Sequence, residues 1–233
     1  MSGNSVDNLD GITLLAPLDD PTRAALAQAC TWTWYTAGAQ ILDRSDPNRD
    51  VFFVARGTVT IVNYSVSGRE VSYDDVESGG FFGELSALDG SPRSASAVAK
   101  VRARVAALPA APFMAMVQAN PAVAMSLLMR MVGIIRASTN RIMDLSTVAA
   151  NNRVQAEVLR IAKVAGPGSD TAKIYPIPNH SDVAARVSTT RETVARVLSD
   201  MTRRGLLERS GHSLIVTDIQ KLRHLVEDVR GDV

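Results

Sequence analysis

The stretch that most constrains the fold is residues 82–95, which read FGELSALDGSPRSA. Gly83 lets the backbone approach a ligand closely, and residues 84–88 can form a short helical turn with free N–H groups. Arg93 supplies a planar guanidinium that matches phosphate oxygens. Glu84 would repel a phosphate, but it can accept a hydrogen bond from a neutral hydroxyl such as a sugar 2′-OH. The stretch therefore predicts a ribose-phosphate site.

This motif resembles the phosphate-binding cassette of cyclic-nucleotide-binding domains. The resemblance implies that the ligand contacts six residues, Gly83, Glu84, Leu85, Ser86, Arg93 and Ser94. The alternative is a strand–turn–strand corner with a surface Arg93 and a solvated Glu84. That alternative is favoured for either residue alone, whereas the spacing of the whole motif favours the cassette.

Composition excludes several classes of protein. The 233 residues carry a net charge of +1 and are 46% hydrophobic and 21% charged, as expected of a globular protein with one or two domains. There is no unbroken apolar run of about 18 residues and no signal-peptide pattern, so we expect a cytoplasmic protein outside the membrane. With Cys30 as the single cysteine, no internal disulfide or cysteine-based metal cluster can form.

Seven short β-rich runs between residues 31 and 108 predict an antiparallel sandwich or barrel. The runs are TWTWY, QILD, DVFFVA, TVTIVNYS, EVSYDDVE, ASAVA and ARVAAL, and turn residues such as Gly57 and Ser67-Gly68 separate them. Residues 14–30 predict a short helix ahead of the strands, with Pro21 in its first turn and Cys30 buried as a small apolar residue. The loop at residues 45–50 is expected to touch no ligand contact.

A long helix is predicted from Asn120-Pro121 to about Ser146. One apolar seam has alternating spacings of three and four residues, and it consists of Met125, Leu128, Val132, Ile135, Thr139 and Ile142. A second row holds Leu127, Met131 and Ile134. A helix buried within its own subunit is the simpler alternative. A helix with two apolar faces is instead expected to pack one face on the β-domain and the other against a second copy, in a parallel coiled-coil homodimer.

Ser138 and Thr139 interrupt these rows. In the family that the chain resembles, hydroxyl residues at this part of the dimer helix contact the nucleotide base, so the resemblance assigns that role to both. Hydroxyls that bond back to the carbonyl four residues earlier are an equally good explanation for each residue. The bacterial cAMP receptor has an arginine one turn earlier, where this chain has Ile134.

Residues 178–206, PNHSDVAARVSTTRETVARVLSDMTRRGL, predict a helix-turn-helix. The first helix fits residues 181–187, and the second starts near Thr190, with Thr189 and Glu192 at capping-box spacing. The next residues, 205–216, predict a β-hairpin and hence a winged variant.

The exposed start of the second helix carries Thr190, Arg191, Glu192 and Arg196. Arginine can pair with guanine and a carboxylate can accept from cytosine in the major groove. An ordinary solvated face with a Glu192–Arg196 ion pair is the alternative. The segment resembles the recognition helix of the cAMP receptor, in which two arginines and a glutamate read a TGTGA-type half-site, so the resemblance assigns base reading to Arg191, Glu192 and Arg196. Thr190, Arg203 and Arg204 are weaker candidates for phosphate contacts.

The chain is thus identified as a member of the Crp/Fnr superfamily. The resemblance implies an α+β fold, with an antiparallel, jelly-roll-like β-roll (1–119), a dimerisation helix and hinge (120–147) and a winged helix-turn-helix domain (148–233). It also implies a homodimeric transcription regulator that binds cAMP or cGMP and a palindromic TGTGA-like duplex, with RNA polymerase as a candidate partner. All three histidines follow the cassette, which argues against haem, and the lone cysteine argues against an iron–sulfur cluster.

Two other classes of function are considered. In the first, the cassette is vestigial or binds another effector, and the protein binds DNA independently of cyclic nucleotide. Ile134, in place of the arginine of the cAMP receptor, keeps this alternative open. An enzyme is not supported, because no paired-carboxylate, metal-ligand or nucleophile–base group accompanies the cassette. A kinase regulatory subunit or a channel module shares the cassette but has no use for a recognition helix.

Overall fold

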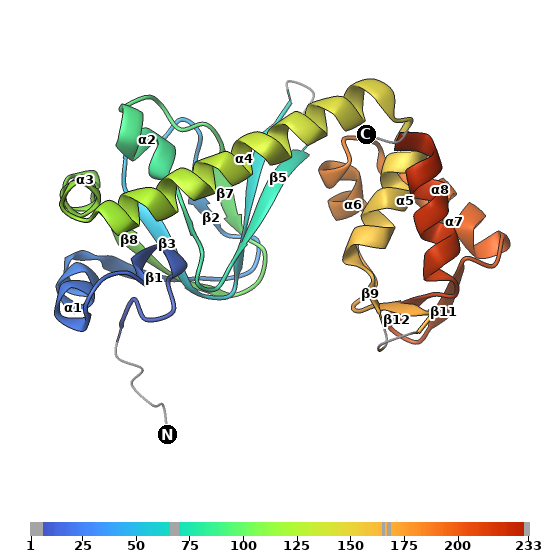
Figure 1. Cartoon of the computed structure of the whole chain (residues 1–233), viewed down its shortest axis with the longest axis horizontal. Coiled ribbons are helices and arrows are strands. Elements are labelled where there is room, and N and C mark those ends of the chain that lie inside the picture. Colours follow the sequence, from blue (N-terminus) through green and yellow to red (C-terminus); the bar gives the residue numbers. More distant parts are fainter. Residues whose placement is uncertain (1–6, 66–69, 165, 167–168, 231–233) are drawn as a thin grey trace. The chain divides into compact units, whose positions relative to one another are not determined.

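The computed structural model describes residues 7–65, 70–164, 166 and 169–230. The chain divides into two compact units, Met1–Ile134 and Ile135–Val233, and the long helix α4 contributes to both (Figure 1). The turn predicted at Ser67-Gly68 lies outside the described residues.

The first unit is a β-roll made of two four-stranded antiparallel sheets, with strand orders β1-β8-β3-β6 and β2-β7-β4-β5. The strands are β1 (Thr31–Tyr35), β2 (Gln40–Leu42), β3 (Val51–Arg56), β4 (Thr58–Tyr64), β5 (Glu70–Glu77), β6 (Phe81–Phe82), β7 (Ser96–Ala99) and β8 (Ala103–Leu108). All seven predicted runs form strands, which confirms the predicted fold class. Only β6, two residues long and directly before the cassette, was not predicted.

Strand β3 is buried on both faces and separates two parts of the core. Phe53 packs in one cluster with Phe81, and Phe52 packs in the other with Phe82. Successive side chains of a strand point to opposite faces, so neighbouring phenylalanines serve different clusters. The rings of Phe52 and Phe82 are stacked with their centroids 5.0 Å apart, directly beneath the start of the cassette.

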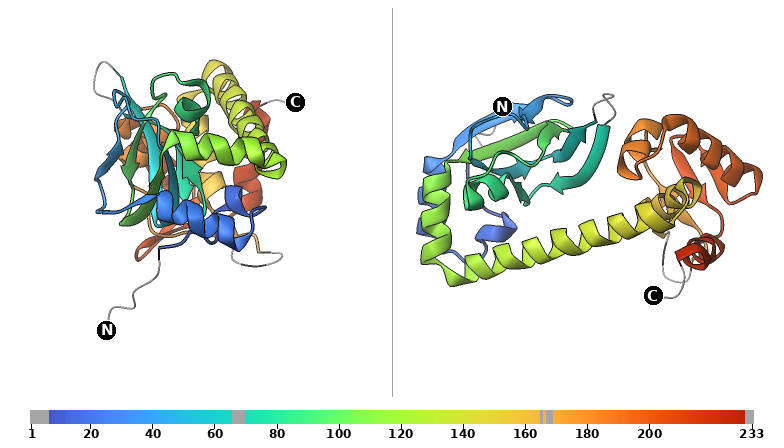
Figure 2. Two further views of the ribbon diagram at one scale, coloured as in Figure 1. Left: turned by 90° about the vertical axis from the view of Figure 1, so that its left-hand side faces the viewer. Right: turned by 90° about the horizontal axis from the view of Figure 1, so that it is seen from above.

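Helices close one end of the β-roll (Figures 1 and 2). They are the 3-10 turn η1 (Thr13–Leu15), α1 (Asp20–Ala29), α3 (Ala110–Ala119) and the start of α4 (Pro121–Thr147), while α2 (Glu84–Asp89) lies in the cassette. Asp19 caps α1 by accepting from the Thr22 backbone N–H at 2.9 Å, and Pro21 lies in the first turn as predicted. Helix α3 was not predicted; its Phe113 is fully buried in the core.

The long helix begins at Pro121 as predicted, and its two apolar rows have different environments. Leu127 is buried in the core of the first unit and Met131 packs against it. The seam of Met125, Leu128, Val132, Ile135 and Ile142 is exposed, with Ile135 at 63% and Ile142 at 64%. By length and composition alone, Pro121–Ser146 is long and apolar enough to cross a membrane, with a mean hydropathy of 1.4 over an 18-residue window, although it contains no unbroken apolar run of that length.

The second unit is a winged helix-turn-helix, as predicted. Its helices are α5 (Ala150–Ile161), α6 (His180–Arg186), α7 (Arg191–Arg203) and α8 (Ile219–Arg230). Its sheet has the order β11-β12-β10-β9, formed by β9 (Lys163–Val164), β10 (Ala172–Ile174), β11 (Leu207–Ser210) and β12 (Ser213–Val216). The predicted inner face of α7 is buried and consists of Val194, Val197, Leu198 and Met201. Strands β9 and β10 and helix α8 were not predicted.

Candidate functional site: a phosphate cassette and a recognition helix

The cassette turns at Gly83, the residue before α2. Its φ is +85°, a left-handed conformation that strongly favours glycine. A Cβ at Gly83 would lie 2.9 Å from Arg93 Nη1, 3.0 Å from the Asp50 carbonyl oxygen and 3.2 Å from the Phe52 ring. The turn therefore requires glycine for two reasons, its backbone conformation and the close approach of Arg93.

Arg93 lies beneath this turn and is only 3% exposed. Its Nη1 donates to the Gly83 carbonyl at 2.8 Å, its Nη2 donates to the Asp50 carbonyl at 2.9 Å, and its guanidinium lies 5.6 Å from the Phe52 ring centroid. Its Nε is buried and has no hydrogen-bond partner among the described residues. A buried donor without an acceptor is costly, so the geometry suits an added anionic acceptor at this atom.

Glu84, the first residue of α2, is also buried, at 5% exposure. Burial raises the pKa of its carboxyl group, while its own backbone N–H and the nearby Arg130 and Arg93 act in the opposite direction. Burial likewise lowers the pKa of the Arg93 guanidinium. The alternative of a surface corner with a solvated glutamate and arginine is wrong, because both side chains are buried.

The other predicted cassette residues differ in exposure. Ser86 is buried at 2%, whereas Leu85 and Ser94 are exposed. The Ser94 carbonyl accepts a hydrogen bond from Asn63 Nδ2 at 3.1 Å, which ties the end of the cassette to β4. The expectation that the loop at residues 45–50 touches no predicted ligand contact was wrong, because the Asp50 carbonyl accepts a hydrogen bond from Arg93.

Ser138 and Thr139 lie in the second unit, whereas the cassette lies in the first. Neither unit alone therefore brings them together with Arg93. Both side chains are exposed, and Thr139 Oγ1 donates to the Ile135 carbonyl at 3.0 Å. This is the back-bonding that was considered as the alternative for that residue.

The helix-turn-helix has its turn at residues 187–190. Ser188 has a φ of +52°, and Thr190 caps α7 by accepting from the Thr193 backbone N–H at 3.2 Å. The predicted capping box was wrong by one residue: Thr189 is buried, at 7% exposure, and Thr190 is the capping residue. The predicted start of the second helix is confirmed.

The three predicted base-reading residues, Arg191, Glu192 and Arg196, and the predicted phosphate contact Thr190 are all exposed at the start of α7. The pKa of the Glu192 carboxyl is lowered chiefly by a hydrogen bond from its own backbone N–H. A side-chain hydrogen bond with Thr190 and the charge of Arg191 lower it further. Arg196 instead approaches Asn151 Oδ1 at 3.4 Å. Within the described part of the chain no Glu192–Arg196 ion pair forms, so that part of the alternative is wrong. The exposure of these side chains fits a solvated face as well as a DNA-reading one.

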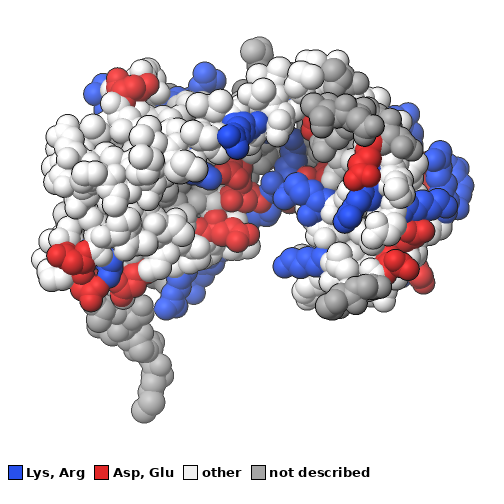
Figure 3. All heavy atoms as spheres, in the orientation of Figure 1, with Lys and Arg blue, Asp and Glu red and all other residues white. Residues whose placement is uncertain are grey.

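Basic and acidic side chains are interspersed over the visible face of the second unit (Figure 3). Arg203 and Arg204 at the end of α7 both pair with Asp200, at 2.6 and 2.8 Å. These two arginines would have to leave Asp200 to reach a phosphate, which keeps them weaker candidates than Arg191.

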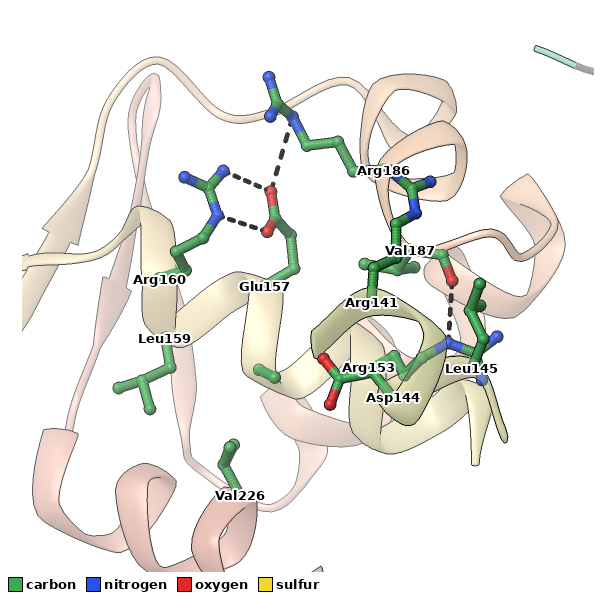
Figure 4. A pocket seen from close by; sticks show the side chains of 11 residues that line it. Arg141, Asp144, Leu145, Arg153, Glu157, Leu159, Arg160, Arg186, Val187 and Val226 are labelled. Atoms are coloured by element: carbon green, nitrogen blue, oxygen red, sulfur yellow. Dashed lines mark hydrogen bonds and ion pairs between the residues drawn. The ribbon is translucent and has the colours of Figure 1, made fainter. Parts of the chain in front are cut away.

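A pocket of about 330 Å³ lies where the end of α4 meets α5, α6 and α8 in the second unit (Figure 4). At its edge Arg153 donates to three carbonyls, of Val148 at 2.6 Å, Val187 at 2.9 Å and Ser188 at 3.2 Å. Arg153 thus joins the α4–α5 connection to the turn of the helix-turn-helix. Sequence reasoning missed this residue because its acceptors are backbone groups that no motif identifies.

Comparisons with known proteins give the same two parts. Residues 32–120 match the family model of the cyclic nucleotide-binding domain, and residues 153–225 match that of the Crp-like helix-turn-helix domain. The cAMP-activated global transcriptional regulator Vfr of Pseudomonas aeruginosa is 30% identical over 190 residues, covering 78% of this chain and 87% of Vfr. A CRP-like cAMP-activated global transcriptional regulator of Mycobacterium tuberculosis is 24% identical over 200 residues, covering 85% of this chain and 89% of that protein.

Solved structures share the fold. A CooA mutant from Carboxydothermus hydrogenoformans matches with a TM-score of 0.76 at 19% identity, over 93% of this chain and 95% of CooA. The c-di-GMP-responsive regulator CLP of Xanthomonas campestris matches with a TM-score of 0.74 at 18% identity, over 85% of this chain and 99% of CLP. The two family models and the similarity to Vfr show that this chain belongs to the Crp/Fnr family, whose members are DNA-binding transcription regulators and not enzymes.

Proposed function

We propose that this chain is a homodimeric transcription regulator whose DNA binding responds to a cyclic nucleotide, cAMP or cGMP. The observation that carries the proposal is the buried Nε of Arg93, which has no partner among the described residues. Arg93 packs against the Gly83 turn, where a Cβ would lie 2.9 Å from its Nη1, and its charge acts on the buried Glu84. An anionic phosphate and a neutral hydroxyl on one ligand would satisfy both side chains.

Each cassette residue has a proposed role. Arg93 would hold the phosphate, and Glu84 would accept the ribose hydroxyl. The exposed Ser94 would meet the phosphate or the base edge, while Leu85 and Ser86 line the turn. From α4, Ser138 and Thr139 would contact the base, which requires Thr139 to give up its bond to the Ile135 carbonyl.

The identity of the ligand rests on weaker support than its class. Vfr and the Mycobacterium tuberculosis relative are named as cAMP-activated. The same fold, however, occurs in the c-di-GMP-responsive CLP and in CprK complexed with OCPA. A regulator with a vestigial or differently liganded pocket is therefore the second candidate, and the apolar Ile134 on α4 favours it.

A second copy of the chain is the proposed partner for the exposed seam of α4. The seam repeats every three and four residues, which is the pattern of a parallel coiled coil. Lipid is a poor partner for this helix, because Arg130 and Arg136 would have to enter the hydrocarbon layer. We propose the dimerisation helix and hinge at 120–147, between a sensor domain at 1–119 and a DNA-binding domain at 148–233.

In this dimer the two α7 helices would enter successive major grooves of a palindromic TGTGA-like duplex, about 34 Å apart. Arg191, Glu192 and Arg196 would read base edges, and Thr190 would contact a phosphate. Nucleotide binding would shift the population toward the DNA-competent arrangement by acting through α4. Contact with RNA polymerase would then decide the effect on transcription.

The test is fluorescence anisotropy on a labelled TGTGA–TCACA inverted repeat, without ligand and with cAMP, cGMP or c-di-GMP. We expect one cyclic mononucleotide to tighten binding, and Arg93→Ala to remove the response while leaving unliganded DNA binding intact. Arg191→Ala should reduce binding to the specific duplex with or without ligand. Equal binding under all conditions would favour the constitutive alternative, and tightening by c-di-GMP alone would replace the proposed ligand.

A further inference from the structure

Arg130 lies on α4 beside the cassette and outside the exposed seam. Its Nη2 is 2.8 Å from Oδ2 of Asp74 on β5, and the two side chains are 39% and 49% exposed. The pair joins residues 56 positions apart in the first unit. The next turn of the helix at this site carries Ile134, which has no charge.

Asp74 and Arg130 belong to the same electrostatic environment as Glu84. The charge of Arg130 lowers the pKa of the Glu84 carboxyl more than the charge of Arg93 does, and both oppose the rise that burial causes. The negative charge of Asp74 raises the pKa of Glu84, opposite to the effect of the two arginines. The charges of Arg130 on α4 and Asp74 on β5 therefore both act on Glu84, the first residue of α2 in the cassette.

We propose that Arg130 is a further ligand-binding residue, which Asp74 holds in the unliganded protein and which exchanges Asp74 for the ribose phosphate when the ligand binds. The inference rests on the proposed function. The exchange costs little, because an ion pair between half-exposed side chains is weak. A guanidinium offers the ligand several donors in a fixed plane. Since Arg130 is part of α4, its exchange would also move the helix that leads to the second unit.

A different account of the same contact is that the Asp74–Arg130 pair only ties α4 to β5. The two accounts predict opposite signs for one substitution. If Asp74 competes with the ligand for Arg130, then Asp74→Asn should tighten nucleotide binding. If the pair is only a structural tie, Asp74→Asn and Arg130→Gln should both weaken binding or both leave it unchanged.

The experiment is calorimetric titration of the full-length protein with cAMP and cGMP. We expect Asp74→Asn to tighten binding by about twofold to fivefold, which corresponds to the loss of one exposed ion pair. We expect Arg130→Gln to weaken binding by about tenfold or more, as for the loss of a charge-assisted hydrogen bond. The double variant should bind like Arg130→Gln, because asparagine at 74 acts only by releasing Arg130.

Asp75→Asn is the matched control. Asp75 is the next residue on β5 and pairs with Lys100 at 2.8 Å, so the variant removes the same charge without releasing Arg130. Thermal melting of each variant excludes misfolding. Wild-type protein that binds neither nucleotide would overturn the proposed function and this inference together. Wild-type binding without tightening by Asp74→Asn, or with equal tightening by Asp75→Asn, would overturn this inference alone.

Discussion

Glu84 and Arg93 lie in the same buried turn, but the hydrogen bonds that hold the Arg93 guanidinium go to backbone carbonyls and not to the Glu84 carboxylate. Arg93 donates to two backbone carbonyls, and the Glu84 carboxyl receives a hydrogen bond from its own backbone N–H. Burial disfavours the ionised Glu84 carboxylate more than its backbone N–H and the charges of Arg130 and Arg93 favour it, so the ionised form destabilises the folded state. The unliganded cassette therefore retains the unfavourable free energy of burying the Glu84 carboxylate, which a hydrogen bond from a ligand hydroxyl would reduce.

This cost predicts a pH-dependent effect of Glu84→Gln. Burial raises the pKa of Glu84, so its contribution to stability is present below the unfolded-state pKa and is lost as the pH rises through the folded-state pKa. Glutamine stays neutral at every pH. We expect the ligand-free variant to melt at a higher temperature than the wild type at pH 7, and the difference to shrink toward pH 4.

Differential scanning fluorimetry across this pH range measures the effect. Glu77→Gln, at an exposed position on β5, serves as the control and should show no such trend. A Glu84→Gln variant that is less stable than the wild type at pH 7 would mean that the ionised carboxylate stabilises the unliganded protein, contrary to the prediction.

At the residue scale the sequence identified the side chains that carry a motif and missed those defined by distant contacts. Gly83, Glu84 and Arg93 lie within eleven positions and could be placed in one turn from their spacing. Asp50 is 43 positions from Arg93 and contributes a backbone carbonyl, an acceptor that every residue has. Arg130 reaches Asp74 across 56 positions, so only the fold brings them together.

Helix α4 is the element whose two faces need different partners. Leu127 is buried in the β-roll, while Ile135 and Ile142 expose more than 60% of their surface. We expect Ile135→Arg, or Ile142→Arg, to convert the proposed dimer into a monomer, because each residue would meet its counterpart across a parallel coiled coil. Light scattering coupled to size-exclusion chromatography measures the mass.

Ala137→Arg is the matched control for this prediction. Ala137 is exposed on the same helix and lies outside the seam, so its replacement should leave the mass unchanged. A dimer that survives both isoleucine variants would place the interface elsewhere and leave the seam of α4 without a second copy as its partner.

A second element-level prediction concerns Arg153, which joins the start of α5 to the turn before α7. We expect Arg153→Lys to lower the stability of the second unit by about 1–3 kcal/mol, since one ammonium cannot replace three donors in a plane. Misplacing α7 should weaken DNA binding several-fold, both with and without nucleotide. Nucleotide affinity measured by calorimetry should stay the same; a change in it would show that Arg153 acts on the sensor pocket.

Elements bounded by turn residues were predicted well, and the others were not. Strand β4 was recognised as a β-rich run between Gly57 and Ser67-Gly68, although a register shift between Ile61 and Val62 places its buried Val59 and Val62 three positions apart. Helix α3 was missed because its sequence, AAPFMAMVQA, is apolar on nearly every side and carries a proline near its start. The cap of α7 was placed one residue early because Thr189 and Thr190 are adjacent. Each has a polar residue three positions later, Glu192 and Thr193 respectively.

At the scale of the whole molecule, α4 is the one helix among the described residues that contributes to both units. Any signal carried by covalent structure from the cassette to α7 must pass along this helix. Arg130 lies on its first part, while Ser138 and Thr139 lie on its second. A ligand that contacts both parts would bind differently to different arrangements of the helix, which is the requirement for a shift in population.

Thermodynamic reciprocity makes this coupling measurable from either end. If nucleotide tightens DNA binding by some factor, DNA must tighten nucleotide binding by the same factor, typically about 5- to 150-fold. We expect calorimetric titration of the protein–DNA complex to give a nucleotide affinity higher than that of the free protein by the factor found in anisotropy. Unequal factors would mean that the ligand also changes the oligomeric state. If both factors equal one, the nucleotide binds without acting on α7, and the protein is a constitutive DNA binder.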